Sequence, residues 1–404
     1  MNIQENRLWN HIQELGMIGR AEDGSVTRLP FTKEDQQAET LLLKWMREAG
    51  LDTRVDAVGN VIGIYSGREP ELPPVVCGSH FDSVVEGGIF DGCLGVLAGI
   101  EVLQTMKKQG IRPKRTHMVI GFRDEEGNRF GYGMVGSKSF CGVMGREGFQ
   151  STDANGYTLQ EAMELAGFHP EDYTSCQSKA HRYYELHIEQ GRILEDQDTA
   201  IGIVSGISAL TRYTITFKGE SAHAGATAMK HRIDPVVAMS AWISEITRLA
   251  TLYPDTTATI GEIHTYPGAC NIICDHVTCS LDIRSLKGEH IEEIMKKMEE
   301  FHKQSNSGVV MELQLEQHMD ACPSDHEVIT LLDKICKEQG IPVVHLASGA
   351  GHDAMNFKNV CPIGMIFVRS VRGYSHRKEE YSRKEDCALG CELLYQILCH
   401  EGHE

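Results

Sequence analysis

Hydrophobic and polar positions alternate between strand-like and helix-like patterns along the first half of the chain. Short apolar runs at 55–64, 74–78 and 117–122 predict strands. The segment 92–109 predicts a helix, and the first sixteen residues read as an amphipathic helix. Such alternation of strands and helices is typical of an α/β sheet that helices cover on both faces.

The pattern changes near residue 208. Strand-like segments at 212–218, 257–264, 277–284 and 309–317 combine with helical segments at 234–252 and 289–303, in the order β-α-β-β-α-β. This order is that of a ferredoxin-like domain. Helix–strand alternation resumes at about 323. We therefore predict an inserted ferredoxin-like domain at 208–321 within a discontinuous mixed-sheet α/β domain formed by 1–207 and 322–404.

Composition narrows the possible functions. The formal net charge of −18 argues against nucleic acid as a partner, because phosphate binding needs a basic face. No apolar run approaches the length that spans a membrane, and the N-terminus lacks an apolar signal core. Thirteen cysteines without a Cys-x-x-Cys spacing indicate reduced thiols and a cytoplasmic protein.

Four separated polar clusters lie close to the ends of predicted strands. They are His80/Asp82/Asp91, Asp124-Glu125-Glu126, His187-Ile188-Glu189-Gln190 and His376. Any one of them is commonplace, since a lone histidine is more often a packing or surface residue than a ligand. Ligands of α/β sheets bind beyond the carboxyl ends of strands, so the co-occurrence of four clusters there favours a shared site.

The residue types in these clusters point to metal chemistry. Histidine and carboxylate ligands without thiolate suit Zn²⁺, Mn²⁺ or Co²⁺. Two metal ions that share a bridging carboxylate need about five protein ligands, and a further carboxylate must stay free to carry a proton. Adjacent Glu125 and Glu126 can divide these roles, and the residues alone do not decide which takes which. Asp82 can orient the imidazole of His80.

Six motifs carry a resemblance to a known family. GSHFDSVVEGGIFDG, DEEGNRFGYGMVGSK, ELHIEQGRILE, HAGATAM, SGAGHDA and GYSHRKEEYS occur in this order and span nearly the whole chain. The chain resembles the di-metal amidohydrolases that include N-carbamoyl-L-amino-acid hydrolase, allantoate amidohydrolase and β-ureidopropionase. More distantly, it is similar to aminoacylases and di-zinc exopeptidases.

The resemblance implies a role for each cluster. It implies two divalent metal ions per subunit, Zn²⁺ or else Mn²⁺ or Co²⁺, with Asp91 as the bridging ligand. The implied metal ligands are His80, Asp91, Glu126, His187 and His376. Glu125 becomes the general base and Asp82 the group that orients His80. The order of the Glu125–Glu126 pair thus rests on the family.

The resemblance also implies that the inserted domain is a lid and dimerisation domain. His223 is expected to reach the active site of the partner subunit in a homodimer and to stabilise the oxyanion. Asn271 and Arg284 are expected to hold the substrate carboxylate, with Gln190 and Gly351 as further substrate contacts. Arginine suits this role because its guanidinium makes bidentate contacts. The alternative for Arg284 is a strand-end side chain in solvent.

The implied reaction is hydrolysis of a C–N bond in a small ureido or amide substrate that bears a carboxylate. An N-carbamoyl-L-amino acid, giving amino acid, carbon dioxide and ammonia, is the expected substrate. Allantoate-specific members are expected to carry Gln-Arg-Arg-Tyr where this chain has Leu210-Thr211-Arg212-Tyr213. Thr211 in place of a cation therefore disfavours allantoate. The alternatives are an allantoate amidohydrolase, an aminoacylase or dipeptidase, and a binding protein with a relict site.

Overall fold

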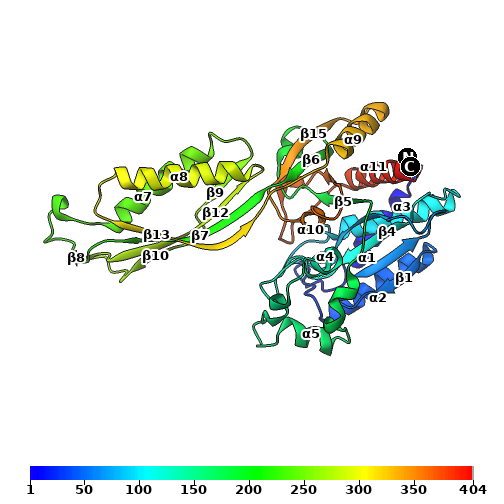
Figure 1. Cartoon of the computed structure of the whole chain (residues 1–404), viewed down its shortest axis with the longest axis horizontal. Helices are drawn as coiled ribbons and strands as arrows, with labels where there is room; N and C mark the ends of the chain where they lie inside the picture. The colour runs from blue at the N-terminus through cyan, green and yellow to red at the C-terminus, as the bar shows by residue number, and fades with distance from the viewer. Residues whose placement is uncertain (403–404) are drawn as a thin grey trace. The chain divides into compact units, whose positions relative to one another are not determined.

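A computed structural model describes residues 1–402 of the chain, which divide into two compact units (Figure 1). Unit 1 contains the residues up to Ser205 together with those from Ser324 onward, and unit 2 is Gly206–Pro323. Unit 1 is therefore formed by two separate segments of the chain, and unit 2 is the segment inserted between them. The chain is a mixed α/β protein.

Unit 1 is built on a mixed sheet with the strand order β1-β2-β4-β3-β5-β16-β6-β14, in which β15 also pairs with β6. The neighbours β4, β3, β5 and β16 are parallel to one another, so their carboxyl ends meet at one edge of the sheet. The strand bounds are β1 Asp52–Val55, β2 Val61–Tyr65, β3 Val75–His80, β4 His117–Phe122, β5 Arg182–Ile188, β6 Ile201–Ile207, β14 Cys322–Pro323, β15 Val343–Ser348 and β16 Ile363–Val368.

Two predicted strands are each broken into two. The segment 55–64 contains the end of β1 and most of β2, which pair antiparallel. The Asp56 carboxylate accepts hydrogen bonds from the backbone N–H groups of Val58 and Asn60, which forms a local turn between the strands. In unit 2, 257–264 is interrupted where the Ser280 hydroxyl accepts the N–H groups of Gly261 and Glu262.

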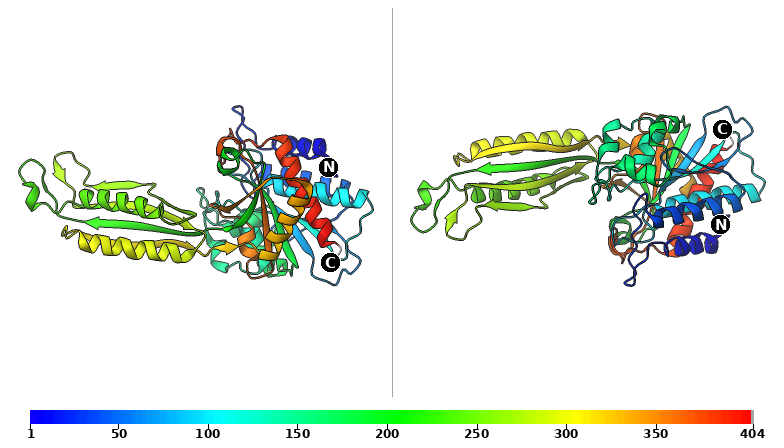
Figure 2. Two further views of the ribbon diagram at one scale, coloured as in Figure 1. Left: turned by 90° about the horizontal axis from the view of Figure 1, so that it is seen from above. Right: turned by 90° about the horizontal axis from the view of Figure 1, so that it is seen from below.

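One face of the unit 1 sheet carries the main hydrophobic core. Every residue of α3 from Cys93 to Met106 is buried, as expected for a helix that is apolar on nearly all sides. Figure 2 shows α1 and α11 side by side near the two ends of the chain. The helices that contribute to this core are α1 Glu5–Leu15, α2 Lys33–Glu48, α3 Cys93–Lys108, α9 His326–Gln339 and α11 Lys384–Glu401.

The opposite face of the sheet is covered by short helices and by an aromatic cluster. Phe122 of β4 and Tyr183 of β5 meet Phe140 of α4 and Phe357 of α10. The rings of Tyr183 and Phe357 stack with centroids 3.9 Å apart. The remaining short helices of unit 1 are α4 Val135–Cys141, η1 Arg146–Gln150, α5 Leu159–Leu165, η2 Pro170–Cys176, α6 Ile193–Asp196, α10 Ala354–Phe357 and η4 Val371–Gly373.

Unit 2 contains an antiparallel sheet with the strand order β10-β12-β7-β13, in which β9 also pairs with β12. Two helices pack on one face, where alternate residues of β12 from Val277 to Ile283 are buried. A separate pair, β8 and β11, follows the end of the sheet. The bounds are β7 Ala209–Lys218, β8 Ala222–His223, η3 Met229–His231, α7 Pro235–Ala250, β9 Thr256–Thr259, β10 Ile263–Tyr266, β11 Ile272–Ile273, β12 His276–Ser285, α8 Gly288–Gln304 and β13 Val310–Met319.

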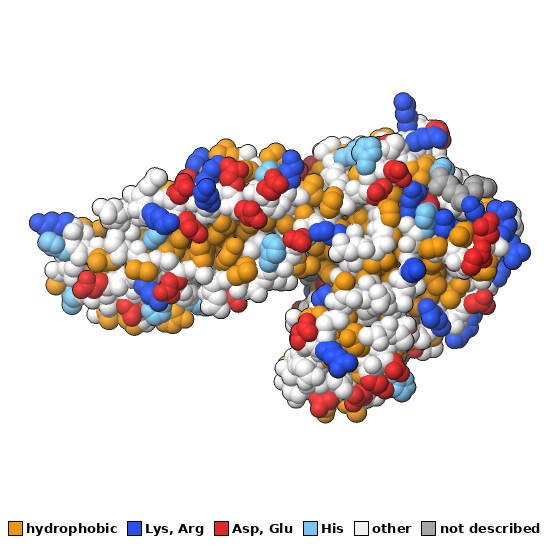
Figure 3. Space-filling model, viewed as in Figure 1, with side chains coloured by type: hydrophobic (Ala, Val, Ile, Leu, Met, Phe, Trp, Pro, Cys, Tyr) orange, Lys and Arg blue, Asp and Glu red, His pale blue; other side chains and the backbone are white. Residues whose placement is uncertain are grey.

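The surface of α8 on the face drawn in Figure 3 is charged but mixed in sign. Helix α8 buries Ile291, Ile294 and Met298, and its other positions are rich in glutamate and lysine. Figure 3 shows acidic and basic side chains interspersed over this helix on the face drawn there. No single-sign patch therefore covers α8 on this face. Within residues 1–402, no helix is long and apolar enough to cross a membrane, and the thirteen cysteines are free thiols.

A buried arginine connects the core to the chain segment after β4. Arg123 is fully buried, and its guanidinium lies 3.0 Å from the Asp35 carboxylate and 2.5 Å from that of Glu39. Its guanidinium carbon is 4.6 Å from the Phe168 ring centroid and 5.2 Å from that of Phe81. Arg123 immediately precedes Asp124-Glu125-Glu126. This ion pair therefore holds the start of that acidic segment in place.

We predict that Arg123→Ala destabilises unit 1 strongly. Asp35 would stay buried without its counterion, which typically costs about 3–5 kcal/mol. Urea-induced unfolding followed by near-ultraviolet circular dichroism measures the change. Lys44→Ala is the control, because Lys44 pairs with Glu48 on the surface at 3.9 Å and exposed pairs contribute at most about 1 kcal/mol. Equal stabilities of the two variants would contradict this interpretation of Arg123.

Candidate active site

The structure brings the four polar clusters of unit 1 to one edge of its sheet. His80 is the last residue of β3, and Glu125 and Glu126 follow β4. His187 is the penultimate residue of β5, and His376 lies in the segment after β16. Since these four strands are adjacent and parallel, their carboxyl ends converge. The edge predicted to bind a ligand is the edge where the clusters meet.

Asp91 lies at the centre of the cluster. Its Oδ1 atom is 3.1 Å from Nε2 of His187 and 3.8 Å from Nε2 of His80. Its Oδ2 atom is 3.2 Å from Nε2 of His376, which in turn lies 3.5 Å from Oε1 of Glu126. The two oxygens of one carboxylate thus face different histidines. This is the geometry that a bridging ligand requires.

Two groups of possible metal ligands share Asp91. His80, Asp91 and His187 form one, and Asp91, Glu126 and His376 form the other; in each, the ligand atoms lie within 4.8 Å of one another. Asp91 Oδ1 is buried and has no hydrogen-bond partner among the described residues. An orphaned buried carboxylate oxygen beside imidazole nitrogens fits a divalent metal ion. The residues present therefore suit the metal chemistry that the sequence predicts.

Glu185, His187 and His352 form another such group, and His80, Glu125 and Glu126 a further one. The Glu185 oxygens already accept hydrogen bonds from the hydroxyls of Ser79 and Tyr183 and from the N–H of Ala354. These partners leave little ligand capacity on Glu185. The two groups that share Asp91 therefore fit metal ions better.

Electrostatics in the cluster reflect an excess of buried carboxylates. Burial and the neighbouring Asp91 raise the pKa of Glu126 to about 7, and burial raises the pKa of Glu125 well above its usual range. Burial alone would raise the pKa of Asp91, but His187 and His376 hold it well below its usual value. The contact with Asp91 raises the pKa of His376 to about 9. Such a set of charges favours a bound cation.

Asp82 lies beside His80 and also holds both glutamates. Its carboxylate is 3.6 Å from Nδ1 of His80, and its backbone oxygen is 3.2 Å from the same atom. The carboxylate oxygens accept the backbone N–H groups of Glu125 and Glu126, each at 3.2 Å. Oε2 of Glu125 lies 3.9 Å from Nε2 of His80. Asp82 thus connects β3 to the acidic segment, a contact that the sequence did not predict.

Unusual backbone conformations shape this edge. Asp124, Gln190 and His376 have φ values of +60°, +59° and +57°, in the left-handed region that non-glycine residues rarely adopt. Gly92 has φ +63°, and a Cβ atom there would come within 2.4 Å of the His80 ring. Only glycine fits this position, which lets Asp91 approach His80. The glycine after the GSHFDSVVEGGIFD run is therefore part of the site.

Gln190 and Gly351, the predicted substrate contacts of unit 1, take different positions. The Gln190 side-chain amide donates to Oδ2 of Asp91 at 2.9 Å. Gly351 lies exposed between β15 and α10. Two residues near Asp91 were missed by sequence reasoning, namely Ser375 and Glu380. Both lie in the GYSHRKEEYS motif, but nothing in that motif alone distinguishes Glu380 from the exposed Glu379.

The predicted residues of unit 2 do not form one group. His223 pairs with Ile272 across β8 and β11, and the Ala224 N–H donates to the Asn271 carbonyl, so His223 and Asn271 lie near each other. Arg284 is near the other end of β12. From His276 to Arg284 the strand extends roughly 26 Å, at about 3.3 Å a residue. The structure thus separates Arg284 from His223 and Asn271 within one chain.

Arg284 does not extend freely into solvent. Its Nε and Nη2 atoms donate to the two oxygens of Asp282 at 2.7 and 3.0 Å. Arg212 donates to the same carboxylate at 2.9 Å. Two guanidinium groups therefore share one carboxylate on the face of the sheet that the helices leave uncovered.

The position of Thr211 gives no geometric support to the expectation that this residue disfavours allantoate. Thr211 is buried and its hydroxyl lies 3.1 Å from Nδ1 of His318. Alternation along β7 places Thr211 on the face opposite Arg212. A cation at this position would therefore not extend beside Arg284. The residue at 211 gives no support for discrimination against allantoate.

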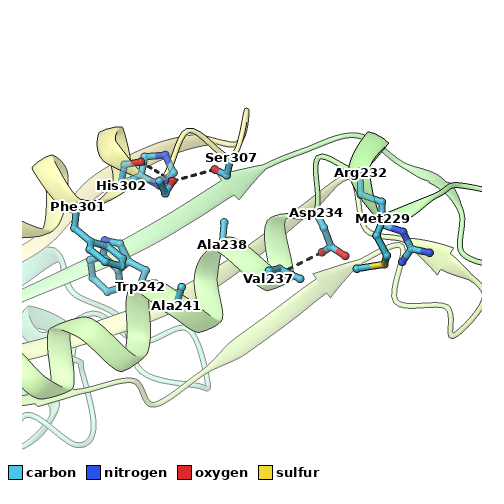
Figure 4. Close-up of a pocket in the computed structure, with 11 residues that line it drawn as sticks. Met229, Arg232, Asp234, Val237, Ala238, Ala241, Trp242, Phe301, His302 and Ser307 are labelled. Atoms are coloured by element: carbon cyan, nitrogen blue, oxygen red, sulfur yellow. Dashed lines mark hydrogen bonds between the residues drawn. The ribbon is translucent and has the colours of Figure 1, made fainter.

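A groove in unit 2 is separate from the candidate active site. It lies between α7 and the end of α8 and has a volume of about 290 Å³ (Figure 4). Val237, Trp242 and Phe301 are among the apolar side chains that line it. None of the predicted site residues lines it. The ligand cluster of unit 1 is therefore the candidate active site.

Comparison with known proteins agrees with this assignment. Residues 72–400 match the model of peptidase family M20/M25/M40. The N-carbamoyl-L-amino acid amidohydrolase of Geobacillus stearothermophilus is 43% identical over 403 residues, which cover 98% of each chain. The allantoate amidohydrolase of Bacillus subtilis strain 168 is 34% identical, over 98% of this chain and 97% of its own.

A solved structure shares the fold over the whole length. It is an amidase of the hydantoinase/carbamoylase family from Burkholderia multivorans, with a TM-score of 0.93 and 32% identity, covering 100% of this chain and 98% of that one. The chain therefore belongs to peptidase family M20/M25/M40, a hydrolytic and metal-dependent family. Within it, the chain falls in the branch that contains N-carbamoyl-L-amino-acid and allantoate amidohydrolases, which confirms the resemblance seen in its motifs.

Proposed function

We propose that this enzyme hydrolyses N-carbamoyl-L-amino acids to the amino acid, carbon dioxide and ammonia. The observation that carries the proposal is Asp91, whose two oxygens belong to two separate ligand groups, with Glu125 beside them. Relatives support the choice of substrate, since the 43%-identical protein of G. stearothermophilus bears this name. The relative named allantoate amidohydrolase is less similar, at 34%.

The proposed cofactor is a pair of divalent ions, Zn²⁺ or else Mn²⁺ or Co²⁺. His80 and His187 would hold one ion, Glu126 and His376 the other, and Asp91 both. When bound, the pair polarises the scissile carbonyl and makes a water molecule acidic near neutral pH. Glu126 suits the ligand role because it groups with Asp91 and His376, whereas Glu125 groups with His80 and Glu126 but not with Asp91.

Glu125 is the proposed general base. Its carboxylate takes a proton from the attacking water, and the water oxygen then forms a bond to the carbonyl carbon. Glu125 passes that proton to the amino-acid nitrogen as its bond to the carbonyl carbon breaks, and the carbamate that remains decomposes to carbon dioxide and ammonia. Burial raises the pKa of Glu125, which favours a group that must accept and return a proton. Asp82 fixes the backbone of Glu125 and the ring of His80.

Unit 2 supplies the proposed substrate contacts. Arg284 and Asn271 hold the substrate carboxylate, His223 stabilises the oxyanion, and Gln190 and Gly351 of unit 1 add further contacts. Asn271 lies just before the start of β12, and Arg284 lies near the end of this strand. The two side chains are therefore too far apart to hold one carboxylate from the same chain. This separation supports a homodimer in which each site takes residues from both subunits.

The same proposal assigns unit 2 as a lid and dimerisation domain. Its element order and its strand order β10-β12-β7-β13 support the ferredoxin-like interpretation. A hinge between such a domain and the rest would admit the substrate and release the products. The free cysteines support a cytoplasmic location.

A substrate panel tests the proposed function. The purified protein, supplied with Zn²⁺, Mn²⁺ or Co²⁺, is given N-carbamoyl-L-amino acids, N-carbamoyl-β-alanine, allantoate and N-acetyl-L-amino acids. We expect equal amounts of amino acid and ammonia from the first class. Preference for allantoate would favour the alternative amidohydrolase. Turnover confined to N-acetyl substrates, which release no ammonia, or no turnover at all would overturn the proposal.

Glu125→Gln should keep the metal content and lose turnover by about 10²–10⁴-fold, because the amide cannot carry the proton. Metal analysis and kcat are measured on the same preparation. Glu48→Gln, on the exposed surface of α2, is the matched control and should behave as the parent. Near-normal kcat in Glu125→Gln would show that another group is the base.

Arg284→Lys should raise KM for N-carbamoyl-L-amino acids roughly 10- to 100-fold while kcat changes less. Lysine keeps the charge but loses the bidentate contact, and hydrogen bonds to charged groups contribute about 1.5–3 kcal/mol. Steady-state kinetics measure the two constants. Arg248→Lys is the control, since Arg248 pairs with Glu245 on the surface of α7. An unchanged KM would mean that the substrate carboxylate has a different anchor.

A further inference from the structure

A buried carboxylate that belongs to neither ligand group lies behind Asp91. Glu380 is only 5% exposed. Its Oε1 atom accepts the backbone N–H groups of Phe90 at 2.9 Å and of Asp91 at 3.0 Å. Its Oε2 atom lies 3.1 Å from the hydroxyl of Ser375. Both carboxylate oxygens are thus engaged, and one partner is the backbone of the central ligand itself.

Ser375 extends this contact to the Asp91 side chain. Its hydroxyl lies 2.9 Å from Oδ2 of Asp91, the oxygen that faces His376. Ser375 directly precedes His376, and Glu380 follows four residues later. Glu380 therefore joins the segment that carries Asp91 to the segment that carries His376, although the two are 285 positions apart in the chain. One fixed point is Asp91, which both ligand groups share, and the other adjoins His376, which belongs to the second group alone.

The Glu380 side chain packs closely against Gly88. A Cβ atom on Gly88 would come within 2.4 Å of Oε1 of Glu380 and 2.5 Å of its Cβ. The Glu380 side chain thus occupies the space that a larger residue at 88 would need. The absence of a side chain at Gly88 lets the two segments approach closely here. This close approach gives Gly88 a structural reason in the GSHFDSVVEGGIFDG motif.

A second buried carboxylate, that of Glu392, accepts backbone N–H groups as Glu380 does, but not from residues of the ligand groups. Glu392 of α11 accepts the backbone N–H groups of Asn2 and Ile3 and the side-chain amides of Asn2 and Gln396. It ties down the N-terminus and contacts no residue of the ligand groups through these bonds. Glu380 differs because its bonds end on Asp91. The two glutamates therefore allow a matched comparison.

We propose that Glu380 is a positioning residue for the metal site, which fixes the Asp91 carboxylate relative to His376 through the Asp91 backbone and the Ser375 hydroxyl. The inference rests on the proposed metal pair. Glu380 contacts neither substrate nor metal ligand atoms directly. Its loss should weaken the group formed by Asp91, Glu126 and His376. The other group is less affected, because His80 and His187 are held within β3 and β5.

The test is zinc titration of the metal-free, full-length protein against a competing chromogenic chelator, with thermal unfolding of the same samples. We expect the parent to bind two ions. Glu380→Ala should bind the weaker ion about 10- to 100-fold less tightly, as is typical when a partner of a metal ligand is removed. The tighter ion should change by no more than about 2-fold. Glu392→Ala should keep both affinities, whatever its thermal midpoint.

Two conservative variants refine the test. Glu380→Gln should stay near the parent, because its carbonyl oxygen can accept both N–H groups while its amide donates to Ser375, which still donates to Asp91. Ser375→Ala removes only the link to the Asp91 side chain and should weaken the same ion. It decides the question if Glu380→Ala fails to fold.

The titration distinguishes failure of the proposed metal pair from failure of the positioning role. A parent protein that binds fewer than two ions would overturn the proposed metal pair. If the parent binds two ions and Glu380→Ala binds both with parent-like affinities, only the positioning role is overturned. If Glu380→Ala does not fold, the same result in Ser375→Ala has this meaning. An equal loss of both affinities would also overturn it, because it would indicate general loosening.

Discussion

The contact between one buried carboxylate and three histidines organises unit 1. Asp91 faces His80 and His187 with one oxygen and His376 with the other. Asp82, Glu125 and Glu126 add further negative charge within the same edge of the sheet. A buried cluster of this kind needs compensating positive charge. Four adjacent parallel strands bring the ligands together, and a metal pair would supply the missing charge.

Buried ion pairs and backbone hydrogen bonds hold the segments that form the candidate site. Arg123, paired with Asp35 and Glu39, holds the segment before Glu125. Asp82 accepts the backbone N–H groups of both glutamates, and Glu380 accepts that of Asp91. Each of these residues acts through backbone or buried side-chain bonds and not through the substrate. The proposed metal ligands and Glu125 are therefore backed by the buried carboxylates of Asp82 and Glu380, which accept their backbone N–H groups.

Much of unit 1 could be predicted from the sequence because its signals are local. The apolar run at 117–122 has the bounds of β4, and the helix at 92–109 matches α3 to within a residue at each end. The residues of both Asp91 groups were named because four polar clusters lie near the ends of predicted strands and because their motifs resemble a known family. The hairpin of β1 and β2 was missed because its turn is made by the Asp56 side chain.

Other features depend on contacts between distant segments, and no local pattern encodes these. Glu380 looks like one of two adjacent surface glutamates until the fold buries it against Phe90 and Asp91. The face occupied by Thr211 follows from the register of β7, which places it beside His318 and away from Arg284. The separation of Asn271 from Arg284 likewise follows from the length of β12. That separation is what supports a site shared between subunits.

The most direct test of the account is the position of bound metal. Crystals of the protein soaked in Zn²⁺ and measured at the zinc absorption edge would locate the ions by anomalous scattering. The account predicts two peaks roughly 3.5–4 Å apart, each within bonding distance of a different oxygen of Asp91. A single peak, or zinc bound at Glu185, His187 and His352 instead, would contradict it.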